Sequence, residues 1–456
     1  MSSYHSVSDS PIINRLQLAD VFASGEKSPS SWLIGTEHEK FGFCLDDLSP
    51  PPFDGERGIE ALLKSLTRFH WQENQENGRT IGLSRQGASI SLEPAGQLEL
   101  SGAAVPTIHA TYAETHAHLR EVNEVAAELG LGFLAMGFQP KWARNDMPWM
   151  PKERYRIMRR YMPIVGQLGL DMMTRTCTVQ VNLDYANEDD MIKKFRVALA
   201  LQPVVTALFA DSPFTQGRPN GYLSYRSHVW TQTDPQRTGM LDFVFEPGFG
   251  YERYVDYLWN VPLYFVHRDG RYYDVAGKPF SQLVAGQLSA LPGVRACLGD
   301  WLDHMTTAFP EVRMKKYLEM RGADCGSFER ICALPALWVG LLYNSCALDA
   351  AWDLTKRMSR EDRHALRQGV PSHALALPYG SGTVRDLAKE MLAIAREGLR
   401  RRACLNDQGQ DESCYLDVLD AIVLSGVTPA EEKLRRYVNR WGQQIDPIFN
   451  DYVLRV

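Results

Sequence analysis

Polar and apolar residues alternate along the stretch from residue 87 to residue 102, which reads GASISLEPAGQLELSG. Alternation with a period of two is typical of a half-buried strand, so this stretch predicts two short strands. The Pro-Ala-Gly sequence at 94–96 predicts a tight turn or bulge between them. Glu93, Gln97 and Glu99 would then share one face of the pair, with the apolar side chains on the other.

Two further stretches repeat this arrangement. In IGTEHEKFGF, Glu37 and Glu39 are two residues apart, so both side chains point to the same side of a strand. His38 lies on the opposite face, where a packed core histidine is a better interpretation than a metal ligand. In YLEMRGAD, Glu319 and Arg321 likewise share one face.

Helical spacing of apolar residues occupies much of the remaining chain. Helices are predicted at residues 58–69, 107–129, 151–165 and 188–209, and the stretches 296–308, 326–358, 381–403 and 414–442 are expected to be mostly helical. Strands are predicted within residues 32–45, 80–102, 132–139 and 177–183, and in a hairpin built from 261–267 and 271–274. The segment 212–240 is rich in Gly, Pro, Arg and aromatic residues and is interpreted as a long functional loop.

Strands interleaved with helices predict an α+β fold, in which an antiparallel sheet carries the site and helices pack outside it. No linker divides the chain cleanly. We therefore expect a single catalytic domain over residues 1–456, with an N-terminal arm at 1–30 and a helical C-terminal part at 381–456.

The composition is that of an ordinary globular protein of 456 residues, 45% of them hydrophobic, with a formal net charge of −6. The mildly acidic balance argues against a nucleic-acid partner. No apolar run reaches the roughly 20 residues of a membrane span, so no membrane partner is expected. The N-terminus lacks the features of a secretory signal. The eight cysteines form no CxxC pair, which argues against a zinc site and is typical of reduced cytosolic thiols.

The acidic residues of the three strand motifs form the first candidate site. They are Glu37, Glu39, Glu93, Glu99 and Glu319. A solvated strand face explains any one of them, but acids opposite apolar residues in three separate motifs favour a shared site. Two unit charges about 4 Å apart repel by roughly 4 kcal/mol at an effective dielectric near 20. Oxygen ligation of a hard ion such as Mg²⁺ would relieve this repulsion.

Basic residues form the second candidate group. Those at helical spacing in PKERYRIMRRYMP include Lys152 and Arg156, and a solvated helix face explains them equally well. Arg226 differs, because aromatic residues flank it in a Gly-rich segment, where binding of a carboxylate or phosphate is the better interpretation. The chain contains no GxxxxGK[ST] and no GxGxxG after a strand, so metal ions and arginines would have to hold any nucleotide.

Six stretches of this chain resemble the glutamate–cysteine ligases of the plant and proteobacterial type, within the glutamine-synthetase-like carboxylate–amine ligases. The stretches are IGTEHEKFGF, GASISLEPAGQLELSG, GLDMMTRTCTVQVNLDY, ALFADSPFTQGRPNGYLSYRSHVWTQTDPQRTGML, FPEVRMKKYLEMRGAD and LPALWVGLLY. The resemblance implies a curved antiparallel sheet that forms a funnel, with helices outside. It also implies ATP-dependent joining of the glutamate γ-carboxylate to the amine of cysteine, through γ-glutamyl phosphate, as the first step of glutathione synthesis.

The resemblance assigns roles to these residues. The metal ligands for Mg²⁺ or Mn²⁺ would be Glu37, Glu39, Glu93, Glu99 and Glu319. Catalysis would depend on Arg321, facing the transferred phosphoryl group, and on Glu93. Glutamate and cysteine would be bound by Arg226, Arg175, Gln180, Asn182 and Trp230. ATP phosphates would be bound by Lys152, Arg156 and Arg237.

Departures from the plant members shape the remaining expectations. Of the positions aligned with two regulatory disulfides, Val275 and Ala290 replace one pair, and Tyr112 replaces the partner of Cys332. The chain also shows no plastid-type transit segment. We therefore expect a bacterial cytosolic enzyme without this redox control, acting as a monomer or homodimer. A related ligase with another amine acceptor, as in ergothioneine synthesis, and an inactive regulatory homologue remain alternatives.

Overall fold

Strand β1 (Ile34–Cys44) runs through the middle of the large sheet in the computed structural model, which describes residues 10–456. The sheet is antiparallel, and its order is β14-β15-β7-β1-β5-β4-β3-β2, with β6 paired to the second half of β1. The other strands of the sheet are β2 (Gln72–Glu76), β3 (Arg79–Arg85), β4 (Ala88–Leu92), β5 (Leu98–Ser101), β6 (Leu131–Leu134), β7 (Thr178–Leu183), β14 (Val312–Met314) and β15 (Leu318–Asp324).

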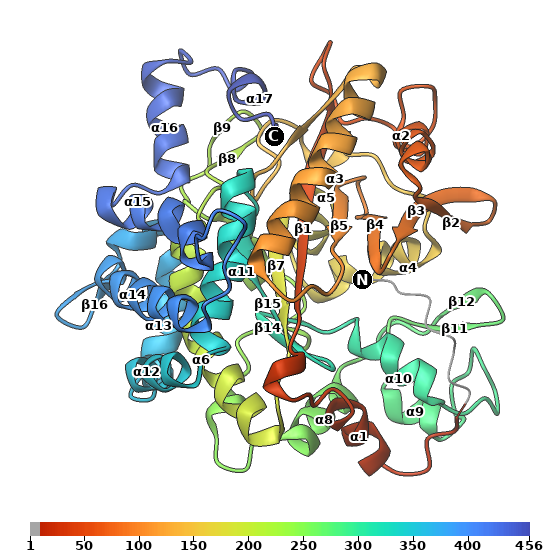
Figure 1. Cartoon of the computed structure of the whole chain (residues 1–456). Helices are drawn as coiled ribbons and strands as arrows, with labels where there is room; N and C mark the ends of the chain where they lie inside the picture. Colours follow the sequence, from red (N-terminus) through yellow and green to blue (C-terminus); the bar gives the residue numbers. More distant parts are fainter. Residues whose placement is uncertain (1–9) are drawn as a thin grey trace.

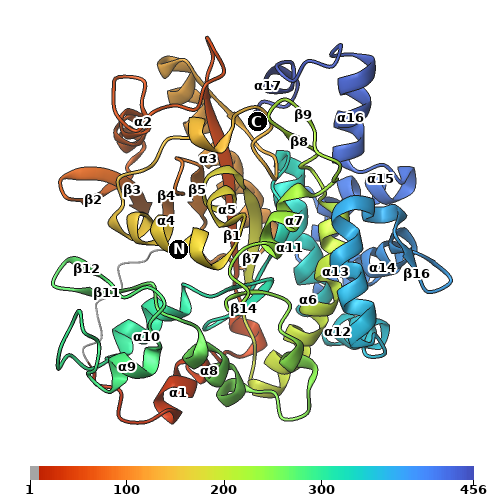
Figure 2. The same cartoon turned by 180° about the vertical axis from the view of Figure 1, so that it is seen from behind.

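Helices cover both faces of this sheet. Helices α3 and α11 pack on one face, against β1, β6 and β7 (Figure 1). In the opposite view, α4, α5 and α7 lie in front of the other face (Figure 2). The helices up to the middle of the chain are α1 (Leu16–Ala23), α2 (Ile59–Leu66), α3 (Ile108–Leu129), α4 (Glu153–Val165), α5 (Gly169–Arg175), α6 (Glu188–Leu208), α7 (Tyr225–Thr231) and α8 (Tyr251–Asn260).

The second half of the chain is mainly helical. Its helices are α9 (Phe280–Val284), α10 (Leu298–Met305), α11 (Phe328–Leu342), α12 (Ser345–Thr355), α13 (Arg360–His373), α14 (Val384–Arg402), α15 (Asp417–Ser425), α16 (Pro429–Asn439) and α17 (Ile448–Asp451). Short strand pairs are β8 (Phe214–Thr215) with β9 (Arg218–Pro219), β10 (Thr238–Gly239) with β13 (Phe309–Pro310), β11 (Phe265–Arg268) with β12 (Arg271–Asp274), and β16 (Pro378–Tyr379) with β17 (Gly382–Thr383). Within residues 10–456, no single helix is long and apolar enough to cross a membrane, although two bent helix pairs together reach that composition.

Local sequence explains why these elements form where they do. The Thr107 side chain caps the first turn of α3 by accepting from the Ala110 amide, and Gly130 ends the helix with a positive φ of 66°. On β7, the valines that alternate with polar residues bury one strand face in the main core with α6 and α11. The alternation in the sequence thus predicts which face of the sheet is apolar.

The α+β class and the antiparallel sheet with outer helices are confirmed, as is the hairpin at 261–274. Two local predictions are wrong. The strand predicted at 132–139 is shorter, since β6 ends at Leu134, where its pairing with β1 stops. The segment 212–240 is not one loop, because Ser224 caps the helix α7 inside it by accepting from the Ser227 amide. Of the predicted arm at 1–30, residues 1–9 lie outside the described residues.

Candidate active site

A row of glutamates crosses the sheet on the face opposite α3 and α11. Glu39 lies directly across from Glu99 in the β1–β5 pair. Directly opposed residues in an antiparallel pair share a face of the sheet. Glu93 lies at the turn between β4 and β5, where its amide donates to the Gln97 carbonyl at 2.9 Å.

Strand β7 connects this row to β15. In the β1–β7 pair Glu37 is opposite Gln180, and in the β7–β15 pair Glu319 is opposite Asn182. The Asn182 amide donates to Glu37 at 2.8 Å. These residues range from position 37 to position 319 in the sequence, and strand pairing brings them together on one face of the sheet.

Most of these carboxylates resist ionisation. Burial raises the pKa of Glu37, of Glu39 and of Glu93, and the negative charge of Glu99 raises each of them further. A bound cation would favour the charged form of all of them. An all-oxygen donor set under mutual repulsion fits a hard divalent ion such as Mg²⁺. Among the described residues, no three of these carboxylates come within 4.8 Å of one another, so the donors are spread along the row.

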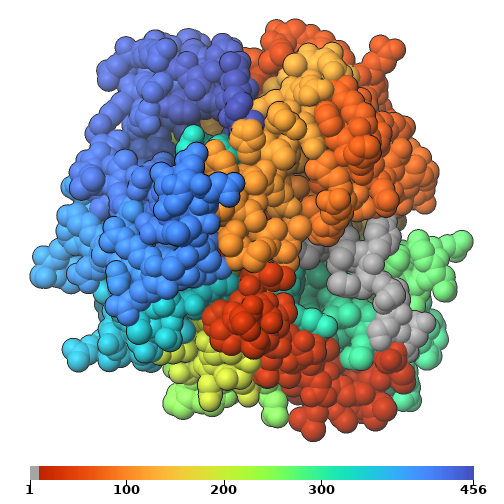
Figure 3. Space-filling model, in the orientation of Figure 1, coloured from red at the N-terminus to blue at the C-terminus, as the bar shows by residue number. Residues whose placement is uncertain are grey.

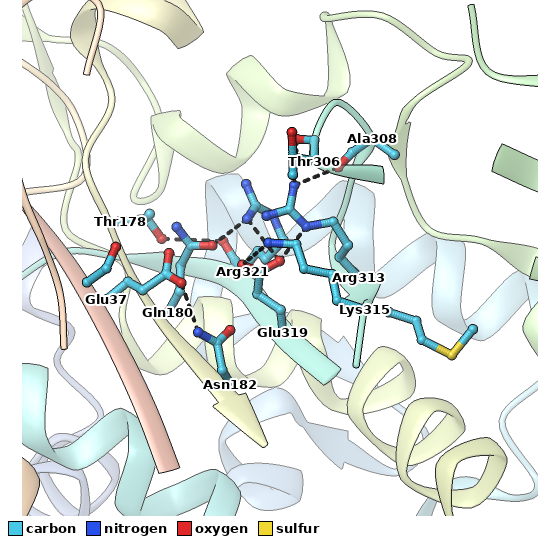
Figure 4. A network of polar contacts seen from close by, with 12 residues as sticks. Glu37, Thr178, Gln180, Asn182, Thr306, Ala308, Arg313, Lys315, Glu319 and Arg321 are labelled. Atoms are coloured by element: carbon cyan, nitrogen blue, oxygen red, sulfur yellow. Dashed lines mark hydrogen bonds and ion pairs between the residues drawn. The ribbon is translucent and has the colours of Figure 1, made fainter. Parts of the chain in front are cut away.

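Glu319 differs from the other glutamates because cations surround it. Arg313 forms an ion pair with it, and Lys315 Nζ and Arg321 Nη1 each lie 3.5 Å from its carboxylate oxygens (Figure 4). Burial alone would raise the pKa of Glu319, but the three cations outweigh burial and hold it well below the usual range. Arg321 also donates to the Gln180 side chain at 2.6 Å, which fixes its guanidinium above the sheet.

Arg226 and Trp230, both on α7, line a narrow pocket beside Arg321. The Arg226 guanidinium donates to the Arg321 carbonyl at 3.0 Å and lies 5.8 Å from the Trp230 ring. Arg226 Nε and Trp230 Nε1 are buried, and neither has a hydrogen-bond partner among residues 10–456. A cation and two free donors side by side can bind a carboxylate.

Two of the predicted binding arginines lie elsewhere, with partners of their own. Arg175 forms a buried ion pair with Asp171, four residues earlier on the same helix. Arg237 is fully buried, pairs with Asp234, and donates to two backbone carbonyls. Both side chains have structural partners that satisfy them. The sequence could not reveal this, because the same residue type serves a buried ion pair and a substrate equally well.

The basic residues at the start of α4 do not all face the glutamate row as predicted. Arg156 is exposed and pairs with a glutamate on its own helix, outside the glutamate row. Lys152 is buried and donates to the Leu92 carbonyl at 2.9 Å, where Glu93 attracts its charge. Arg154, which the sequence analysis passed over, interacts electrostatically with Glu93.

Arg313 and Lys315 were also missed. The signal for them was present, because they are two residues apart in EVRMKKY and so share a strand face by the same rule that placed the glutamates. His38, as expected, is fully buried on the other face, with its ring edge against His118 at 5.5 Å between centroids.

Comparisons with known proteins identify the family of this chain. The family "Glutamate-cysteine ligase family 2" matches residues 33–451. The chain is 53% identical over 440 residues to a chloroplastic glutamate–cysteine ligase of Brassica juncea, covering 96% of this chain and 84% of the relative. It is 52% identical to the chloroplastic enzyme of Arabidopsis thaliana, covering 96% and 83% of the two chains.

A solved structure of a glutamate–cysteine ligase from Francisella tularensis in complex with AMP is similar in fold, with a TM-score of 0.57 and 13% identity, covering 92% of this chain and 87% of that one. The curated plant relatives overturn one expectation. They are named as chloroplastic enzymes, so a bacterial cytosolic protein, inferred from the missing transit segment, is the wrong interpretation. From its match over nearly the whole length, the chain belongs to glutamate–cysteine ligase family 2.

Proposed function

We propose that this protein joins the γ-carboxylate of glutamate to the amine of cysteine at the expense of ATP, giving γ-glutamylcysteine, ADP and phosphate. This is the activity of its family and the first step of glutathione synthesis. The observation that carries the residue assignments is the row of buried and half-buried glutamates that ends at the cluster of Arg313, Lys315 and Arg321.

The glutamate row would hold the divalent ions. Glu37, Glu39, Glu93 and Glu99 would supply the carboxylate oxygens, and the raised pKa values of the first three mean that a nearby positive charge would favour their ionised forms. Mg²⁺ or Mn²⁺ held there would neutralise ATP phosphates, which is the chemistry that such ions supply to phosphoryl transfer. Glu319 would complete the donor set from β15.

The cations around Glu319 would act on the transferred phosphoryl group. When glutamate attacks the γ-phosphorus, negative charge spreads over the phosphoryl oxygens and must be neutralised. Arg321, held by Gln180 and placed two residues from Glu319, is the residue we assign to this charge. Arg313 on β14 and Lys315, the residue after this strand, belong to the same cluster and would add positive charge beside the phosphoryl group. The amine of the second substrate then attacks the acyl phosphate, and phosphate leaves.

Substrate binding is assigned to the pocket of α7. A substrate carboxylate would accept from Arg226 Nε and Trp230 Nε1, two buried donors of this pocket that have no hydrogen-bond partner among residues 10–456. Such charge-assisted contacts are roughly twice as strong as neutral ones. Gln180 and Asn182 lie on the same face of the sheet as the glutamates, and their side-chain amides would also contact the substrates.

The test is an ADP-release assay with glutamate, Mg²⁺ and a panel of amine acceptors, with γ-glutamylcysteine identified by mass spectrometry. Turnover that requires cysteine supports the proposal. Turnover with a different amine and not with cysteine would establish a related ligase instead. No ADP release with any acceptor, from a folded chain that binds ATP, would establish an inactive homologue.

A further inference from the structure

A second cavity lies on the face of the sheet that α11 covers, and it shares no lining residue with the substrate pocket of α7. It has a volume of about 590 Å³ and is enclosed by the start of α11, by α15 and α16, and by the last residues of the chain. In Figure 3 the surface is hollowed below the dark blue C-terminal segment. Pockets that bind small molecules usually measure about 300–1,000 Å³, so this one is large enough for an organic ligand.

Two of the cations that line this cavity have no ion-pair partner among residues 10–456, whereas two of its acids have partners. Arg435 and Arg455 are exposed and have no ion pair or hydrogen bond among residues 10–456. Of the acids, Glu432 already binds Arg436, and Asp451 accepts from the Trp441 indole at 3.1 Å. A third acid of the lining, Glu329, is exposed and has no ion pair within residues 10–456, so the unpaired charges are two guanidinium groups against one carboxylate and the balance is positive.

The first turn of α11 adds to this preference for an anion. Ser327 at its N-cap lines the cavity and makes no side-chain capping bond, so the first amide groups of the helix lack that partner. Arg330, also in this turn, is only 6% exposed, and its Nη1 has no partner among the described residues. A buried donor without an acceptor is costly, and an anion would satisfy it.

The remaining wall is apolar. It is built from Val418, Ile422, Val427, Val453 and Leu454. A purely inorganic anion would leave this wall in contact with water, whereas an anion with an apolar body covers both kinds of surface. The lining thus fits a small organic carboxylate, sulfonate or phosphate ester.

A chain of buried bonds leads from this cavity to the substrate pocket. Arg330 and Lys433, which both line the cavity, form ion pairs with the buried carboxylate of Asp211. The Asp211 amide in turn donates to the Asp324 carboxylate at 2.9 Å. Asp324 is the last residue of β15, the strand that also carries Glu319.

Asp324 also holds the start of α7. Its carboxylate accepts from the hydroxyls of Ser212 at 2.6 Å and of Ser224 at 2.9 Å. The Ser212 hydroxyl accepts from the Arg226 amide at 3.1 Å. An anion that draws Arg330 toward the cavity would therefore change the position of Asp211 and, through Asp324, that of Arg226.

We propose that this cavity is an effector site for a small organic anion, whose binding alters substrate binding at Arg226 through Asp211 and Asp324. The probe for testing it is 8-anilinonaphthalene-1-sulfonate, an aromatic sulfonate whose fluorescence rises in apolar sites. We expect saturable binding of one probe molecule per chain that persists in the presence of ATP, Mg²⁺ and glutamate.

Three variants separate this site from others. Replacing Arg435→Gln together with Arg455→Gln should weaken probe binding by about tenfold or more, as the loss of charge-assisted contacts predicts. Ala421→Trp, at an exposed position on α15 that lines the cavity, should abolish binding by filling it. Arg401→Gln removes an exposed arginine of the same helical part and should leave binding unchanged. All four positions are exposed, so the fold and the basal activity should survive.

The coupling is measured by the KM for glutamate. Saturating probe should change this KM severalfold in the unaltered protein and leave it unchanged in Ala421→Trp. Displacement of the probe by ATP and glutamate, or equal probe binding by all variants, would overturn the site. Site-specific binding with an unchanged KM would overturn the coupling to Arg226.

Discussion

Replacing Arg226→Lys tests the substrate pocket most directly, because the charge is kept while the planar fork of donors is lost. Arg226 is only 3% exposed and uses one terminal nitrogen to donate to the Arg321 carbonyl at 3.0 Å. Its Nε remains free for substrate. A lysine has a single ammonium group, which cannot hold the Arg321 carbonyl and a substrate carboxylate in the same geometry.

The size of the effect follows from the contact that is lost. A hydrogen bond to a charged group contributes about 1.5–3 kcal/mol, and every 1.4 kcal/mol is tenfold in binding, so the KM for glutamate should rise by roughly 10- to 150-fold. The maximal rate should fall less, because the glutamate row and Arg321 remain. Steady-state ADP release, with glutamate and ATP varied in turn, measures both parameters.

The matched control is Arg401→Lys, on the exposed face of α14, where the arginine pairs with Glu397. It should leave both KM values unchanged. If Arg226→Lys leaves glutamate saturation unaltered and instead weakens ATP, then Arg226 belongs to the nucleotide side and the assignment of the pocket is wrong.

Four other changes test the rest of the structure. Glu93→Gln should lower turnover by several orders of magnitude with an unchanged circular dichroism spectrum, and near-normal turnover would remove it from the metal site. Arg237→Met should leave Asp234 buried without its partner and destabilise the fold by about 3–5 kcal/mol in urea titrations, while a mere loss of ATP affinity would contradict this role. Burial raises the pKa of Asp324 to about 6, so the protonated carboxyl contributes to stability. This contribution is fully present below the unfolded pKa near 4 and is lost as the pH rises through 6. In Asp324→Asn the free energy of unfolding should therefore change less steeply with pH over this range. Reduction and mild oxidation should leave activity unchanged, since even the neighbours Cys177 and Cys325 are fully buried; a bridged peptide that tracks reversible activity loss would refute this.

The sequence by itself determined the glutamate row. Side chains in a strand alternate between two faces whatever the strand packs against, so Glu37 and Glu39 had to share a face, and so did Glu319 and Arg321. The apolar residues between them had to form the opposite face. The same local rule places Arg313 and Lys315, two residues apart, on one face.

Only the tertiary structure decided which cations meet the row. A helix pattern gives the angular positions of Lys152, Arg154 and Arg156 around α4, but the packing of α4 on the sheet decides which of them is buried beside Glu93. Arg237 could not be told from Arg226 by its neighbours in sequence, because its partner at Asp234 and its burial depend on distant backbone carbonyls. The partner of a long charged side chain depends on which element lies within its reach, and tertiary packing decides this, not local periodicity.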